Sequence, residues 1–188
     1  MSTHDDLRAI ALAEFAANGY AGTSLQRIAE VAGVSKASVL YHFSSKEALL
    51  EASVGPAIDR LTTIIDAVDG TLDDREARHA FVEQFVDLLL EHRLEVFLFI
   101  NQGAGLEDVP VVDRANLVVE RLAQFFCTAA STTEDQLRFG MALGGAAYVL
   151  SVKTQPSPRE LPVDEVRAAL VRIVNELLDP IVVVAGTR

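Results

Sequence analysis

The chain has 188 residues, of which 50% are apolar and 23% are charged, and its formal net charge is −11. A chain of this size and composition buries a substantial core, which excludes a largely disordered protein. The single cysteine, Cys127, excludes an internal disulfide and a zinc site built from cysteines.

Apolar residues recur at helical spacing along the chain and strand-like alternation is scarce, so we predict an all-α fold of about nine helices. The first helix should end at Asn18-Gly19, because these residues favour the left-handed conformation that terminates helices. Thr23 with Gln26 forms a capping-box pattern that predicts the start of a second helix, which should end before Gly33.

A short third helix is predicted after Ser35, which is placed to cap it. Val39 and Phe43 lie four residues apart, so they share one face and can anchor this helix in the core. Lys36 and Ser38 are too polar to be buried there, and the opposite face should therefore be offered outward.

A fourth helix should begin at Ser44, because Ser44 with Glu47 repeats the capping-box pattern. Gly55-Pro56 should kink or interrupt this helix, since proline lacks an amide donor and crowds the preceding turn. Later helices are expected over residues 73–93, 94–102, 110–126, 133–153, where Thr133 and Gln136 form a third capping box, and 163–179.

The second and third helices with their connecting turn, about residues 24–43, form a helix-turn-helix pattern. Ala29 and Ala32 are small enough to let the two helices cross closely, and Gly33 can take the left-handed conformation of the turn. Val34 can fill the gap between the helices. This arrangement is typical of proteins that place the later helix in the major groove of DNA.

The pattern predicts a DNA-binding domain over residues 1–49 and a larger helical domain over residues 50–188. The negative charge lies mainly in the second part. Residues 1–53 contain four Lys or Arg against six Asp or Glu, whereas the remainder contains twelve against twenty-one. The overall acidity therefore leaves a DNA contact near the N-terminus possible.

The segment TSLQRIAEVAGVSKASVLYHFSSKEAL, Thr23–Leu49, closely resembles the N-terminal signature of TetR/AcrR-family transcriptional regulators. The groups that match the family pattern are, in order, Ile28-Ala29, Ala32-Gly33-Val34-Ser35, Tyr41-His42-Phe43 and Lys46-Glu47. The resemblance implies a transcriptional regulator that binds a palindromic DNA operator as a homodimer. It further implies a repressor that a small, largely apolar effector releases from the operator.

The resemblance also implies which residues contact DNA. Residues 36–38 would face base edges, whereas Tyr41, His42 and Lys46 would lie near phosphates, and Ser24 would add a hydroxyl at the start of the second helix. The full predicted set is Ser24, Ser35, Lys36, Ala37, Ser38, Leu40, Tyr41, His42 and Lys46.

One position departs from the family pattern. The family most often has tyrosine seven residues after the turn glycine, where it packs on a phosphate, but here Leu40 occupies that position and Tyr41 follows it. Leu40 either meets a thymine methyl or simply packs, so either residue can take the usual role of the tyrosine. His42 fits a packing or capping role as well as it fits a phosphate contact.

The C-terminal helices of this family dimerise and bind effectors. Residues 133–153 and 163–179 carry small and apolar side chains, which predict a four-helix homodimer interface, with an intramolecular core as the alternative. The predicted effector pocket consists of Phe81, Phe85, Phe97, Asn101, Arg121, Phe125, Met141 and Tyr148. Phenylalanines at helical spacing are core residues far more often than pocket walls, and a pocket of this composition would favour an apolar ligand.

Two other classes of protein remain: a helical adaptor or small-molecule-binding protein that does not bind DNA, and a helical-bundle enzyme. The sequence has no paired Glu-x-x-His motif, nucleophile elbow or phosphate-binding glycine loop, so we expect no enzyme activity, metal or cofactor. The first ten residues are acidic where a secretory signal is basic. The longest uncharged run, residues 139–152, is shorter than the roughly 18 residues of a membrane span. We therefore expect a cytoplasmic protein without a membrane partner.

Overall fold

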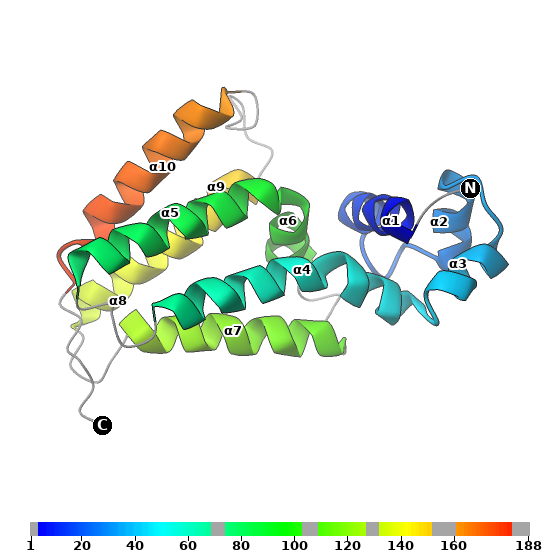
Figure 1. Cartoon of the computed structure of the whole chain (residues 1–188), viewed down its shortest axis with the longest axis horizontal. Helices are drawn as coiled ribbons and strands as arrows, with labels where there is room; N and C mark the ends of the chain where they lie inside the picture. Colours follow the sequence, from blue (N-terminus) through cyan, green and yellow to red (C-terminus); the bar gives the residue numbers. More distant parts are fainter. Residues whose placement is uncertain (1–3, 69–73, 103–108, 127–131, 152–160, 182–188) are drawn as a thin grey trace. The chain divides into compact units, whose positions relative to one another are not determined.

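The computed structural model describes residues 4–68, 74–102, 109–126, 132–151 and 161–181, and the regular elements within these ranges are helices (Figure 1). They are α1 His4–Asn18, α2 Leu25–Val31, α3 Lys36–His42, α4 Lys46–Ala67, α5 Arg75–Glu91, α6 Arg93–Gln102, α7 Pro110–Phe126, α8 Thr133–Phe139, the π-helix η2 Gly140–Gly144, α9 Gly145–Ser151 and α10 Val163–Leu178. α8, η2 and α9 follow one another without a break. If this run is counted as one segment, the described residues contain nine helical segments, which is the number that the sequence predicts. The all-α prediction is confirmed.

The residue that caps α2 is Ser24, and the predicted capping box at Thr23 is wrong. Ser24 has extended backbone angles and its side chain accepts a hydrogen bond from the Arg27 amide at 3.1 Å. Thr23 is buried, and its hydroxyl lies 2.8 Å from the Gly19 carbonyl and 3.1 Å from the Glu14 carbonyl. The Thr23 side chain therefore satisfies the end of α1 and cannot also serve the start of α2.

The same one-residue shift occurs at two other predicted caps. The Ser45 hydroxyl, in place of Ser44, accepts from the Ala48 amide at 3.1 Å at the start of α4. Thr132, in place of Thr133, forms a complete capping box with Asp135 at the start of α8. In each case a neighbouring hydroxyl takes the position with the geometry that a cap requires.

α4 continues through Gly55-Pro56 from Lys46 to Ala67, so the predicted interruption is wrong. Pro56 removes one backbone donor, yet its ring lies on the exposed side of the helix. The surrounding residues Val54, Ala57 and Ile58 are buried, and this packing offsets the loss of the hydrogen bond. The helix is therefore held by its apolar face across its weakest point.

The chain forms two compact units, residues 1–59 with 94–115 and residues 60–93 with 116–188. The functional boundary expected at residue 49 stays a prediction. The core of the first unit contains side chains of α1–α4 that are almost fully buried: Leu7, Ala11, Phe15, Ile28, Ala29, Val39, Phe43, Leu49, Leu50 and Val54. Spacings of three and four residues bring these side chains onto one face of each helix.

In the second unit, α10 packs along α5 (Figure 1). The Arg167 guanidinium donates two hydrogen bonds to the Asp87 carboxylate, at 2.5 and 2.8 Å. At the other end of α10, Asp179 lies 2.6 Å from Arg75 and 3.0 Å from His79. These pairs fix the register of α10 on α5 at both ends.

The hydrogen bonds from Arg167 hold the pKa of Asp87 below its ordinary value of 3.8. A lowered pKa means that the carboxylate stabilises the folded state above about pH 4 and that this contribution disappears as the pH falls through the lowered pKa. We expect Asp87→Asn to reduce the free energy of unfolding at pH 7 by up to about 1 kcal/mol, since the pair is partly exposed. The difference from wild type should shrink below pH 4 in urea unfolding, whereas Asp113→Asn, which changes an exposed aspartate outside this pair, should not reproduce the pattern. A difference that stays constant down to pH 3 would contradict this account.

Candidate DNA-binding surface

The turn between α2 and α3 has the conformation that the sequence predicts. Gly33 has φ +67, in the left-handed region. The Val34 amide donates to the Ala29 carbonyl at 2.9 Å, which closes the turn onto α2. Ile28 and Ala29 are fully buried where α2 meets its neighbours. The backbone of the turn therefore sets the direction in which α3 leaves α2.

α3 is anchored by its two apolar side chains, as predicted. Val39 is fully buried and Phe43 is nearly so. The Ser35 hydroxyl caps the helix by accepting from the Ser38 amide at 3.1 Å. This seven-residue helix is too short to be stable alone, so the cap and the anchors together define its position.

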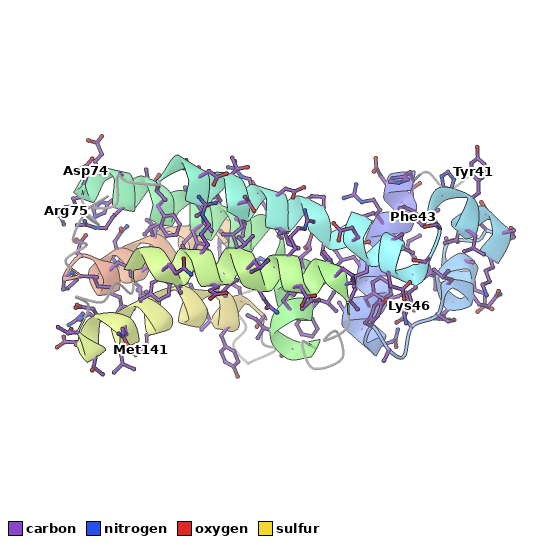
Figure 2. All side chains as sticks on the ribbon, turned by 90° about the horizontal axis from the view of Figure 1, so that it is seen from below. Tyr41, Phe43, Lys46, Asp74, Arg75 and Met141 are labelled. Carbon is purple, nitrogen blue, oxygen red and sulfur yellow. The ribbon has the colours of Figure 1, made fainter. Side chains whose placement is uncertain are left out.

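The outward face of α3 is centred on Ala37 and Tyr41, which each lie about 200° around the helix from the buried Val39. Tyr41 is 87% exposed and Leu40 is 42% exposed. Figure 2 shows the Tyr41 ring projecting away from the protein while Phe43 points inward. Tyr41 is thus the aromatic side chain that this face presents.

The flanks of the same face carry the polar side chains. Lys36 is exposed, and Ser38 and His42 are half-buried. Lys36, Ala37, Leu40 and Tyr41 therefore form a narrow exposed strip, bordered by Ser38. The structure places these predicted residues together on one side of α3.

His42 belongs to an aromatic cluster that sequence reasoning did not find. The His4 ring at the start of α1 packs against Phe43 in a tilted arrangement, with 4.5 Å between ring centroids. His42 lies edge-on to His4 at 6.1 Å and to Tyr41 at 5.3 Å. These contacts favour the packing role for His42, and its phosphate contact stays a prediction.

Lys46 also has a partner that the sequence did not indicate. Its Nζ atom lies 4.2 Å from the centroid of the Tyr20 ring, and the Tyr20 hydroxyl donates to Glu47 Oε1 at 3.2 Å. Burial, reinforced by the charge of Glu47, raises the pKa of Tyr20 to about 12. Burial also lowers the pKa of Lys46. Lys46 and Glu47 thus attach the first turn of α4 to the loop after α1, a contact that joins residues too far apart in sequence for any local pattern to indicate.

Ser24 lies at the exposed start of α2, where its oxygen is engaged by the Arg27 amide. Arg27 itself is paired with Glu14 at 3.0 Å. The DNA-contacting roles of Ser24, Ser35 and the other predicted residues stay predictions.

The predicted effector-pocket residues lie in both compact units. Phe81 and Phe85 are buried in α5 with their rings stacked at 5.8 Å, and Arg121 is paired with Asp66 at 2.5 Å. Phe97 and Asn101 belong to α6 in the other unit, where Asn101 is exposed and donates to the Phe97 carbonyl.

The remaining pocket candidates differ in exposure. Met141 is 58% exposed and Tyr148 is 54% exposed, and Met141 lies on the outer side of its helix in Figure 2. In a single chain these two side chains therefore face outward. The Phe125 side chain lies outside the described residues, and the pocket as a whole stays a prediction.

Within the described ranges, no three His, Cys, Asp or Glu side chains are grouped so that they could hold a metal ion. Among the helices described, none combines the length and apolarity needed to cross a membrane.

The fold and this surface together define a helix-turn-helix protein with a helical C-terminal part, and comparisons with known proteins show which family its N-terminal residues are similar to. Residues 7–53 match the family of bacterial regulatory proteins called tetR. The chain is 51% identical over 49 residues to the HTH-type transcriptional regulator RutR of Escherichia coli (strain K12), which is 26% of this chain and 23% of RutR. It is 44% identical over 55 residues to IcaR of Staphylococcus aureus (strain Newman), the HTH-type negative transcriptional regulator of the biofilm operon icaADBC, with 29% and 30% covered.

The similarity to these curated relatives spans less than a third of their length, whereas the similarity to solved structures extends over most of the chain. SCO3833, a TetR-family member from Streptomyces coelicolor A3, has a TM-score of 0.67 at 25% identity, covering 89% of this chain and 88% of that one. The ketosteroid transcriptional regulator KstR2 of Mycobacterium tuberculosis shares the fold, with a TM-score of 0.63 at 21% identity over 92% and 93% of the two chains. The similarity to the tetR family therefore lies in residues 7–53, and the likeness to SCO3833 and KstR2 extends to the fold of most of the chain.

Gly33 offers a direct test of the turn geometry. A Cβ atom at this position would meet no atom within 4 Å, so substitution changes only the backbone energy. We expect Gly33→Ala to lower the free energy of unfolding by about 1–2 kcal/mol, because a left-handed residue with a side chain is strained. Gly33→Asn should cost less, since asparagine adopts this conformation more readily. Equal stability of the glycine and alanine proteins in urea would show that Gly33 does not have a positive φ.

Proposed function

We propose that this protein is a sequence-specific DNA-binding transcriptional regulator that acts in the cytoplasm. The observation that carries the proposal is the anchoring of α3. Val39 and Phe43 are buried, while Lys36, Ala37, Leu40 and Tyr41 are exposed, with Ala37 and Tyr41 on the side opposite Val39. A short helix held in this way can enter the major groove and place its polar side against base edges.

We propose the predicted set as the DNA contacts, with the roles adjusted to the geometry. Residues 36–38 face base edges. Tyr41 is more exposed than Leu40, which supports Tyr41 as the aromatic contact. Lys46 is held on Tyr20 beside the start of α4, where a phosphate could approach it. Ser24 and Ser35 cap α2 and α3, and His42 contributes mainly by packing.

The protein acts as a homodimer in this proposal. α10 packs against α8 and η2, and large apolar side chains on these helices and on α9 are exposed: Leu137, Met141, Tyr148, Val149 and Ile173. Gly140 and Gly144 have open space where a Cβ would lie, which leaves room for close approach of a second helix. A two-fold dimer matches a palindromic operator whose half-sites lie about 34 Å apart.

The regulator is a repressor that a small, largely apolar effector releases. The negative regulation named for IcaR supports repression, and the apolar character of the helical C-terminal part supports an apolar ligand. The effector shifts the equilibrium only through a difference in affinity between the bound and free conformations. Comparing operator affinity with and without a candidate apolar compound tests this coupling.

Lys36 provides the sharpest test of DNA binding. We expect Lys36→Ala to weaken binding to an operator selected from a random duplex library by roughly 1–3 kcal/mol, because it removes a contact to a base edge. Binding to scrambled duplex should change less. The measurement is fluorescence anisotropy at several salt concentrations, since affinities for DNA depend on salt.

Ala80→Glu is the matched control, because it makes the same change in net charge at an exposed position of α5 in the other unit. If Ala80→Glu weakens binding as much as Lys36→Ala, the effect is one of overall charge. If the wild-type protein selects no sequence from the library, the adaptor function becomes the better explanation.

The dimer is tested at Ile173, which is 47% exposed on α10. We expect Ile173→Asp to convert a dimer of 20.3 kDa chains into a monomer, because a charge cannot be buried unpaired in an apolar interface. Light scattering after gel filtration measures the mass. Val119→Asp, at an exposed position of α7, is the control and should stay dimeric. A wild-type protein that is monomeric at micromolar concentration would contradict the proposal.

A further inference from the structure

The Gly55-Pro56 pair is the weak point of α4. Pro56 has no amide hydrogen to donate to the preceding turn, and glycine has the lowest helix propensity after proline. The residues just before the pair are built into the first unit: Leu49, Leu50 and Val54 are buried in its core. The Ser53 hydroxyl lies 2.7 Å from the Leu49 carbonyl and 3.3 Å from the Arg8 carbonyl of α1. A change of direction at this pair would therefore move α1 and the helices that pack on it.

One arginine from α7 spans this weak point. Arg114 Nη2 donates to Glu51 Oε1 at 2.6 Å, and Arg114 Nη1 donates to Asp59 Oδ1 at 2.8 Å. Glu51 precedes the pair and Asp59 follows it, and the two lie eight residues apart on one face of α4. A planar guanidinium can donate to two carboxylates at once in a fixed geometry, which an ammonium group cannot reproduce. Arg114 thus links the two sides of the Gly55-Pro56 pair through a side-chain brace.

Gly55 lies directly beside this guanidinium and leaves space for it. A Cβ at Gly55 would lie 3.2 Å from Arg114 Nη2 and 3.6 Å from Glu51 Oε1, so a side chain there would press on the brace. The absence of a side chain at residue 55 therefore has a purpose besides flexibility: it lets Arg114 lie close to the helix backbone. Gly55, Glu51 and Asp59 of α4 thus form one interaction network with Arg114 of α7.

We propose that Arg114 is a positioning residue for DNA binding, which holds α4 in its operator-binding conformation across Gly55-Pro56. It acts through Glu51 and Asp59 and does not itself touch DNA. This proposal rests on the proposed DNA-binding function. It gives the start of α7 a direct connection to the helix that supports the DNA-binding helices, so loss of the brace reduces operator affinity without unfolding the protein.

The test is operator affinity of the full-length protein with Arg114→Gln, measured by anisotropy well below the unfolding temperature. We expect a loss of about tenfold, in the usual range for coupling between sites. Arg114→Lys should recover only part of this loss, because it restores the charge without the two-pronged geometry. A structural role alone would lower the melting temperature and leave the affinity of the folded protein unchanged, which would overturn the proposal.

Asp66→Asn is the matched control. Asp66 also joins α4 to α7, through Arg121 at 2.5 Å, but this ion pair does not span the glycine-proline pair. We expect the operator affinity of Asp66→Asn to stay within about twofold of wild type, as is usual for an exposed ion pair. Equal losses from Arg114→Gln and Asp66→Asn would assign the effect to general contact between the helices and would reject the brace.

A double-mutant cycle identifies the partners of Arg114. Glu51→Gln and Gly55→Ala should each weaken operator binding in the wild-type background and have little further effect with Arg114→Gln, because neighbouring substitutions in one network are not additive. Additive losses would contradict the arrangement. If Arg114→Gln fails to fold, Gly55→Ala alone carries the test: unchanged operator affinity rejects the brace. Wild-type protein that binds no operator rejects the proposed function instead, so the two failures are distinguishable.

Discussion

The burial of Val39 and Phe43 is the interaction on which the proposed function depends. α3 has only seven residues, and a helix of this length does not persist alone in water. Burying two large apolar side chains contributes about 1.5–3 kcal/mol each, which is enough to hold the helix against the core. Because both anchors lie on one side, the other side must face outward. The exposure of Ala37 and Tyr41, which lie opposite Val39 on the helix, follows from that single constraint.

The acidity of the chain is compatible with DNA binding because few cations are needed if they are well placed. Arg27 is engaged by Glu14, and Lys46 lies on the Tyr20 ring, so the charges of this region are held in defined positions. A surface of this kind has little attraction for random duplex, since non-specific affinity comes mainly from phosphate neutralisation. In the proposed function, shape and base contacts therefore contribute more to operator selection than bulk charge does.

α4 connects these features to the rest of the molecule. Its first turn is attached to the loop after α1 through Tyr20, Lys46 and Glu47, and the Ser53 hydroxyl in a later turn donates to the Arg8 carbonyl of α1. Arg114 then holds it from α7 across Pro56, which has no amide hydrogen to donate. The proposed brace would make α4 a rigid support while it is engaged.

The sequence alone determined the class of fold and the character of the proposed DNA-binding surface. Helical spacing, the left-handed glycine of the turn and the apolar pair Val39 and Phe43 are local signals, because each depends on residues within one or two turns. Only the tertiary structure decided which of two adjacent hydroxyls caps a helix. The Thr23 hydroxyl bonds to carbonyls at the end of α1, and the Ser24 hydroxyl caps α2. The tertiary structure also decided that α4 runs through Pro56, and it revealed the contacts of Lys46 and Arg114. These features join residues far apart along the chain, and no local pattern encodes which distant side chain will meet which.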